Sequence, residues 1–127
     1  MKNIIQNANV TCFDCDDTLI LWPKDYKTPS PGRIEFEYGS EKVYLIPHSY
    51  HVIFLKHCFN RGDYVIIWSA NGSDWATQVA QKLDLTEHYS QIMCKPIRHV
   101  DDKESLSSII GSRVFIPHET YEIIKHD

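Results

Sequence analysis

Three carboxylates that could hold a metal ion or act on a phosphate follow an apolar run near the start of the chain. Asp14, Asp16 and Asp17 lie within four residues of one another, and the hydroxyl of Thr18 comes next. Negative charges crowded in this way repel one another, and folding gains nothing from holding them together. A divalent cation would compensate the repulsion, and a ligand set made only of oxygen atoms favours magnesium. The spacing therefore predicts a magnesium site centred on Asp14.

Three further polar groups follow other apolar runs. Ser69 comes after the run 64–68, Lys95 after the run 91–94, and Asp101 with Asp102 after the run 97–100. Each has an ordinary explanation when taken alone: a serine in a turn, a lysine on the surface, and an acidic pair at a helix start. In a parallel sheet, however, the carboxyl ends of neighbouring strands meet at the crevice where ligands bind. Their joint occurrence predicts one shared site.

In this order the groups resemble the motifs of the haloacid dehalogenase superfamily, the phosphohydrolases with an aspartate nucleophile. The segment Asp14-Cys15-Asp16-Asp17-Thr18-Leu19 matches the first motif, Asp-x-Asp-x-Thr-Leu, which follows a hydrophobic strand. Ser69 matches the second motif, Lys95 the third, and Asp101-Asp102 the fourth. The resemblance spans residues 9–103. One departure is the short interval between Lys95 and Asp101, which leaves little room for a helix there.

The resemblance implies a covalent phosphatase mechanism. Asp14 would attack phosphorus in line and form an aspartyl-phosphate, as carboxylate nucleophiles do. Asp16 would protonate the leaving oxygen and later activate water. Lys95 would screen the phosphate and the nucleophile from one another. The chain is therefore expected to be a magnesium-dependent phosphohydrolase that cleaves a phosphate monoester.

The same resemblance implies which residues bind phosphate and metal. The phosphate oxygens would be held by the Ser69 hydroxyl and by backbone amides of Ala70 and Asn71, much as helix starts and backbone nests bind anions. Thr18 would orient the loop that carries Asp16, or act only as a cap. The Mg²⁺ ligands would be the Asp14 carboxylate, the Asp16 backbone carbonyl and one of the pair Asp101 and Asp102. The exposed Asp17 has no expected role.

Two rival functions come from other classes of protein. A receiver-type signalling domain also places carboxylates, a hydroxyl and a lysine around magnesium. It would need its phosphate-accepting aspartate at the end of a middle strand, where this chain has Ser69. A catalytically silent binding module with the same fold is the second rival. This alternative stays open, although nothing in the sequence shows loss of activity, because Asp14, Asp16, Ser69 and Lys95 are all present.

Strands that alternate with helices predict a single α/β domain over residues 1–127, with a doubly wound, Rossmann-like parallel sheet sandwiched by helices. Strands are expected at 9–14, 64–68, 91–94, 97–100 and 113–116. Helices are expected from Pro47 to the Arg61-Gly62 stop, after a cap at Ser73 or Asp74, over 103–110 and from residue 118. Residues 20–47 are expected to form an insertion, with a proline-rich loop and a β-hairpin of strands 33–38 and 43–46. This insertion is too short for a full cap domain.

A site with so little cover would be open to solvent. By resemblance, the phosphorylated substrate would then be a nucleotide, a nucleic-acid terminus, a phosphoprotein or a phosphosugar. Trp22 is a candidate substrate contact, whereas Trp75 has the helical spacing of a core residue. The exposed hairpin, with aromatic residues at Phe36, Tyr38 and Tyr44, could pair edges with a second copy and form a homodimer.

Charge and composition restrict the partners. The net charge of −4 argues against binding DNA through a basic surface. No apolar run approaches the ~18 residues of a transmembrane helix, and the start lacks a signal-peptide pattern, so a cytoplasmic location without membrane contact is expected. The four cysteines are scattered and expected to be reduced thiols. His48 and His51, three residues apart on a predicted helix, are expected to lie at the surface without a shared role.

Overall fold

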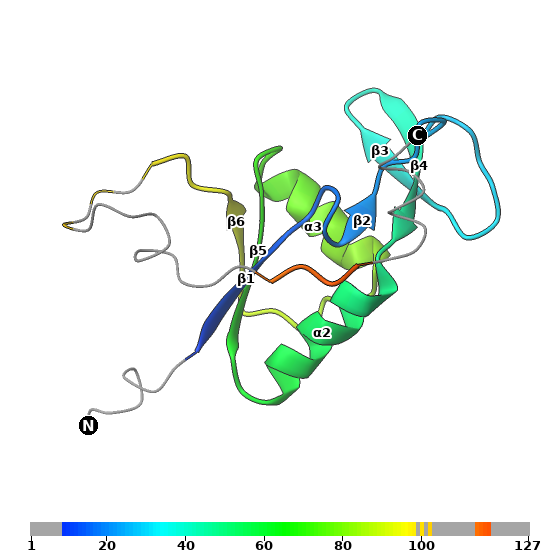
Figure 1. The fold of residues 1–127 in the computed structure, drawn as a ribbon. Helices are drawn as coiled ribbons and strands as arrows, with labels where there is room; N and C mark the ends of the chain where they lie inside the picture. Colours follow the sequence, from blue (N-terminus) through cyan, green and yellow to red (C-terminus); the bar gives the residue numbers. More distant parts are fainter. Residues whose placement is uncertain (1–8, 99, 101, 103–113, 118–127) are drawn as a thin grey trace.

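A parallel sheet carries the ends of the motif-bearing strands. The computed structural model describes residues 9–98, 100, 102 and 114–117. Within them β1 (Val10–Asp14), β5 (Tyr64–Ser69) and β6 (Gln91–Cys94) form a three-stranded parallel sheet in the order β1-β5-β6 (Figure 1). The register pairs Asp14 with Trp68 and Ser69 with Cys94, so the three strands end close together.

Two helices pack against this sheet. They are α2 (Ser49–Asn60) and α3 (Ser73–Lys82), and Figure 1 shows both to the right of the strands. Along β5, Val65 and Ile67 are fully buried whereas Ile66 and Trp68 are half-buried, which is the pattern of a sheet with one well-covered face. The α/β class is therefore confirmed. Among the described residues the helices cover one face of the sheet, so a sandwich on both faces stays a prediction.

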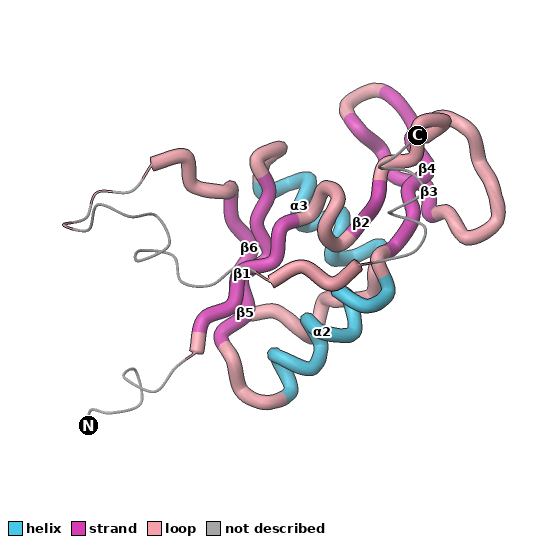
Figure 2. The backbone as a smooth tube through the Cα atoms, viewed as in Figure 1, coloured by secondary structure: helices cyan, strands magenta, loops and turns pink. Residues whose placement is uncertain are grey.

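The predicted insertion forms a second, antiparallel sheet. Its strands are β2 (Ile20–Leu21), β3 (Ile34–Tyr38) and β4 (Glu41–Pro47), in the order β2-β4-β3. The hairpin of β3 and β4 turns at Gly39, whose φ of 65° suits a residue without a Cβ. The hairpin is confirmed. The two-residue β2 was not predicted, and Figure 2 shows the long loop that follows it in pink.

Several element boundaries differ from the prediction. The helix expected from Pro47 begins at Ser49, because Pro47 completes β4 and His48 caps the helix. The cap expected at Ser73 or Asp74 is wrong: Gly72, with φ 105°, takes that position without a side-chain hydrogen bond. The strand expected at 97–100 is absent from its described residues, and the described residues 114–116 of the strand expected at 113–116 are also irregular. The helices expected over 103–110 and from residue 118 lie outside the described residues.

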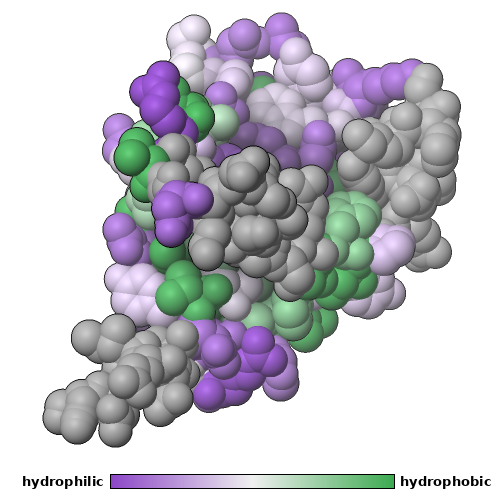
Figure 3. Space-filling view, turned by 60° about the vertical axis from the view of Figure 1, so that its left-hand side comes forward, coloured by the Kyte–Doolittle hydropathy of each residue, from purple (hydrophilic) through white to green (hydrophobic). Residues whose placement is uncertain are grey.

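Exposed apolar side chains gather next to the segments that are not described. They include Val10, Ile97, Val100 and Val114. Figure 3 shows green apolar residues beside grey ones on the face that it presents. Within the described part of the chain, neither helix has the length and hydrophobicity needed to cross a membrane.

Candidate active site

The nucleophile candidate and the lysine candidate meet at the carboxyl end of the parallel sheet. Asp14 is the last residue of β1, and Lys95 directly follows β6. The Lys95 Nζ lies 3.8 Å from Oδ2 of Asp14. The Lys95 backbone N–H donates to the Ser69 carbonyl at 3.0 Å, which anchors the lysine beside the end of β5. The structure therefore brings together the first, second and third predicted motifs.

The Asp14 carboxyl has a raised pKa. The largest cause is burial, which disfavours the charged form, and the neighbouring Asp16 and Asp17 act in the same direction. Lys95 and a hydrogen bond from the Cys15 backbone N–H oppose these effects without cancelling them. A second positive charge beside Asp14 would therefore stabilise the ionised carboxylate that a nucleophile needs.

The Asp16 carboxylate is held by three hydrogen-bond donors from separate parts of the chain. Its Oδ1 accepts from the indole Nε1–H of Trp22 at 2.8 Å and from that of Trp75 at 3.0 Å. Its Oδ2 accepts from the side-chain amide of Asn71 at 2.7 Å. The acid/base candidate thus has a fixed orientation, set by residues of the insertion loop, α3 and the turn after β5.

The loop that carries Asp16 is tightly wound. The Cys15 carbonyl accepts hydrogen bonds from the backbone N–H groups of Thr18, Leu19 and Ile20 at 2.9–3.1 Å. Asp17 has φ 60°, in the left-handed region, and its side chain accepts from the Trp22 backbone N–H at 3.2 Å. An aspartate tolerates this conformation better than most residues.

Thr18 is tied to a buried histidine pair. The Thr18 carbonyl accepts from Nδ1 of His51 at 2.7 Å, and Nε2 of His51 accepts from the Ile116 backbone N–H at 2.8 Å. His48, fully buried, stacks on His51 with ring centroids 3.8 Å apart. The expectation that the two histidines lie at the surface without a shared role is wrong, because residues 114–117 pack over this face of α2.

The predicted phosphate-binding residues have specific local roles. The Ser69 hydroxyl oxygen accepts from the Asn71 backbone N–H at 3.0 Å, so this amide is already bonded. Ser69 is fully buried, at the end of the middle strand. Ala70 is exposed, and its N–H is in no hydrogen bond within the described residues. The Asn71 side-chain amide donates to Asp16 at 2.7 Å.

Two of the predicted metal ligands lie at the end of β1. They are the Asp14 carboxylate and the Asp16 carbonyl, and within the described residues no donor is bonded to that carbonyl. Asp102 is exposed, and Asp101 lies outside the described residues. The described residues hold no cluster of three His, Cys, Asp or Glu side chains suited to a metal. Two oxygen donors fit Mg²⁺, which keeps several waters and takes further oxygens from substrate phosphate.

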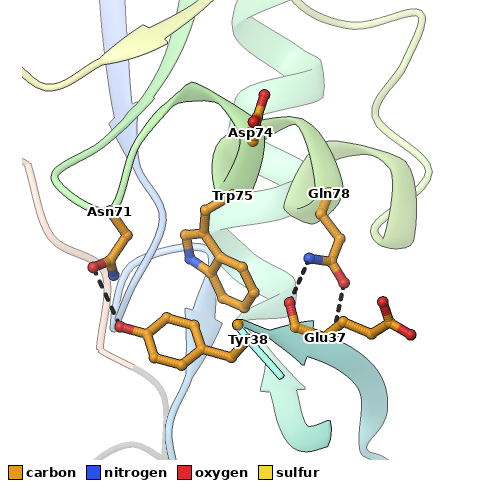
Figure 4. A pocket seen from close by; sticks show the side chains of 7 residues that line it. Glu37, Tyr38, Asn71, Asp74, Trp75 and Gln78 are labelled. Carbon is orange, nitrogen blue, oxygen red and sulfur yellow. Dashed lines mark hydrogen bonds between the residues drawn. The ribbon is translucent and has the colours of Figure 1, made fainter. Parts of the chain in front are cut away.

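An open pocket of about 250 Å³ lies between the hairpin and the start of α3. Figure 4 shows the Trp75 indole pointing from α3 toward the Tyr38 ring, with Asn71 beside them. Asn71 and Trp75 also bond to Asp16, so the pocket adjoins the acid/base candidate. Its lining consists of Glu37, Tyr38, Gly39, Asn71, Asp74, Trp75 and Gln78.

The two indole donors were not predicted as such from the sequence. Trp75 is buried, as its helical spacing predicts, but its N–H reaches a carboxylate. Trp22, the candidate substrate contact, donates its indole N–H to Asp16, and its contact with substrate stays a prediction. The sequence offered only a general rule, that a buried tryptophan usually finds an acceptor for its N–H, and this rule does not identify the acceptor.

Comparison of this chain with protein-family models, curated proteins and solved structures finds no match.

Proposed function

We propose that this protein is a magnesium-dependent phosphatase of the haloacid dehalogenase type, which hydrolyses a phosphate monoester through an aspartyl-phosphate. The observation that carries the proposal is the meeting of Asp14 and Lys95, 3.8 Å apart, beside the buried Ser69. These residues follow three different strands. A nucleophile, a cation and a hydroxyl at one sheet end are the parts that phosphoryl transfer requires.

In the first step an oxygen of Asp14 attacks phosphorus in line. The bond from phosphorus to the leaving oxygen breaks, and that oxygen keeps the electron pair of the bond while it takes a proton from Asp16. Lys95 neutralises negative charge on the phosphoryl oxygens and keeps the Asp14 carboxylate close to them. The Ser69 hydroxyl and the Ala70 N–H supply donors to the same oxygens.

In the second step water attacks the phosphorus of the aspartyl-phosphate. Asp16, now ionised, takes a proton from this water, and the bond between phosphorus and Asp14 breaks with its electron pair on the carboxylate. Inorganic phosphate leaves. Magnesium, held by the Asp14 carboxylate, the Asp16 carbonyl and Asp101 or Asp102, would supply positive charge to the nucleophile and the phosphoryl oxygens.

The leaving group would occupy the pocket between the hairpin and α3. This placement is favoured because Asn71 and Trp75 line the pocket and also bond to Asp16, the proton donor. Glu37 at the pocket would disfavour a leaving group with many negative charges. The substrate classes remain a nucleotide, a nucleic-acid terminus, a phosphoprotein and a phosphosugar.

The proposal extends to the fold and the location. The β1-β5-β6 sheet is the centre of a doubly wound, Rossmann-like sheet in a single domain over residues 1–127, and the protein acts in the cytoplasm. The order of strands supports the proposed fold, because a central strand that ends in Ser69 separates β1 from β6.

The decisive experiment is hydrolysis of p-nitrophenyl phosphate with and without Mg²⁺. We expect metal-dependent release that Asp14→Asn lowers by on the order of 10³-fold or more, because the amide is a poor nucleophile. Asp84→Asn, at an exposed carboxylate, is the matched control and should keep full activity. Turnover that survives in Asp14→Asn would exclude the covalent mechanism. A panel of the four substrate classes would then identify the leaving group.

A further inference from the structure

We propose that Trp22 and Trp75 form an indole clamp that positions Asp16, and that the hairpin sets this position through Tyr38 and Asn71. The inference rests on the proposed function, because it assigns Oδ2 of Asp16 as the oxygen that transfers the proton. Neither tryptophan need touch the substrate for this role. Both act through the carboxylate that they hold.

The clamp occupies one carboxylate oxygen fully. Trp22 and Trp75 donate to the same atom, Oδ1 of Asp16, over 2.8 and 3.0 Å. A carboxylate oxygen has two lone-pair sites, and an indole N–H can only donate. Oδ1 therefore has no site left for a proton. Among the described residues only Asn71 donates to Oδ2, so one lone-pair site of this oxygen is open to the leaving group or to water.

The clamp residues are themselves held in place. Trp75 is buried on α3, and the Trp22 backbone N–H is bonded to Asp17. The two indoles lie 6.1 Å apart, and the Tyr38 ring packs edge-on against both, with centroids 5.1 Å away in each case. Aromatic contacts of this kind restrict the ring orientations. The two N–H groups consequently converge on one point.

The hairpin reaches Asp16 through a hydrogen-bonded chain. The Tyr38 hydroxyl donates to Oδ1 of Asn71 at 3.3 Å, which leaves the Asn71 amide hydrogens to face Asp16. Figure 4 shows this contact together with the pair that docks the hairpin on α3. In that pair, Gln78 accepts from the Glu37 N–H at 2.7 Å and donates to its carbonyl at 2.9 Å. The insertion thus fixes the proton donor without covering the site.

If the clamp positions Asp16 as a proton donor, the loss of activity on removing the clamp should depend on the leaving group of the substrate. A nitrophenolate departs without a proton, whereas an alkoxide needs one as its bond to phosphorus breaks. Mispositioning Oδ2 should therefore slow an alkyl phosphate much more than p-nitrophenyl phosphate. A merely structural loss of active protein would slow both substrates equally.

The first test compares Trp22→Phe and Trp75→Phe with Trp68→Phe, using glycerol 2-phosphate and p-nitrophenyl phosphate. Phenylalanine keeps an aromatic ring and removes the N–H. For each clamp variant we divide kcat/KM for the alkyl phosphate by kcat/KM for the aryl phosphate, and we expect this ratio to fall by about 10-fold or more, which is part of the roughly 10²–10⁴-fold effect of a general acid. Trp68 makes no hydrogen bond to Asp16 within the described residues, so its variant should keep the ratio. An equal loss on both substrates would overturn the inference.

The second test needs no activity. It compares ¹H–¹⁵N spectra of the intact wild-type chain and of Asp16→Asn. The substitution removes the negative charge to which two of the three indole N–H groups donate. We expect the Trp22 and Trp75 indole resonances to shift and the Trp68 resonance to stay, with Asp84→Asn as the control. Unmoved resonances would overturn the clamp. If the two resonances shift in Asp16→Asn but the wild-type protein hydrolyses neither phosphate, the contact stands, and the proposed function and the catalytic role of the clamp are overturned.

Discussion

Nζ of Lys95 lies 3.8 Å from Oδ2 of Asp14, although β5 separates the strands that carry the two residues. The lysine bridges this gap because its side chain is long and its backbone N–H is bonded to the Ser69 carbonyl. The two side chains are 44% and 33% exposed. At this distance and exposure an ion pair adds little to stability. The proximity of Lys95 and Asp14 therefore bears on the chemistry of the site more than on the stability of the fold.

Lys95→Ala is expected to weaken the binding of tungstate, a tetrahedral oxyanion, and to lower kcat/KM by on the order of 10²-fold, because a charge that stabilises the transition state is lost. The free energy of unfolding should change by less than about 1 kcal/mol. Inhibition constants and denaturant titrations measure the two effects. Lys82→Ala, at an exposed lysine near the end of α3, should change neither, and unchanged tungstate affinity in Lys95→Ala would contradict the assignment.

Asp14→Asn is expected to raise the free energy of unfolding at pH 7 without magnesium, by about 0.5–2 kcal/mol, as is common when a residue kept for function is replaced. Burial raises the pKa of Asp14, so folding disfavours its charged form. A carboxyl group with a raised folded pKa stabilises the fold below its unfolded pKa and loses that contribution as the pH rises through the folded value.

The stability gained by Asp14→Asn should therefore shrink as the pH falls through the raised folded pKa of Asp14, and it should vanish below about pH 4, where the carboxyl is neutral in the unfolded chain as well. Urea unfolding at both pH values, in the presence of a chelator, measures the difference. Asp84→Asn controls for the loss of one negative charge. A variant less stable than wild type at pH 7 would show that Lys95 outweighs the cost of burial.

Asp63→Asn should have the opposite pH dependence. Hydrogen bonds from Arg61, at 2.8–3.1 Å, lower the pKa of Asp63, and Thr11 donates to the same carboxylate at 3.2 Å. Its stabilisation is present at neutral pH and lost as the pH falls through the folded pKa. We expect a cost of about 1–3 kcal/mol at pH 7 that narrows below about pH 4. Urea titrations beside Glu87→Gln test this, and a pH-independent cost would refute it.

His51→Ala is expected to lower the free energy of unfolding by about 2–4 kcal/mol, because it leaves two partly buried backbone groups without the partner that the ring supplies. The Thr18 carbonyl can only accept and the Ile116 N–H can only donate, so the neutral ring carries its proton on Nδ1. Thermal or urea unfolding measures the loss. His57→Ala, at an exposed position on the same helix, should cost far less, and similar costs would mean that the ring does not join these segments.

Local patterns predicted the described elements where one physical cause dominates. The valine and isoleucine residues of β5 give a buried strand, because that composition suits a sheet covered by helices. The hairpin follows from strict alternation between Arg33 and Tyr38 and from Gly39, which adopts the left-handed turn. The described residues of the runs at 97–100 and 113–116 form no strand. A run of four residues has no periodicity that distinguishes a strand from a loop.

The directions of side chains were harder to predict from the sequence than the helices and strands. Spacing alone placed His48 and His51 at the surface, since nothing local shows that residues 114–117 cover them. Helical periodicity placed Trp75 in the core but could not show where its N–H points. Such contacts join residues that are tens of positions apart in the chain.

The order of residue types was sufficient to locate Asp14, Ser69 and Lys95 at strand ends and to suggest phosphate chemistry, because strand signals and charge crowding are local properties of a chain. Only the folded molecule decided how Asp16 is oriented. Its three donors come from Trp22, Asn71 and Trp75, and their convergence depends on how the hairpin, the β5 turn and α3 pack together. Packing is a long-range property, so no window of sequence contains it.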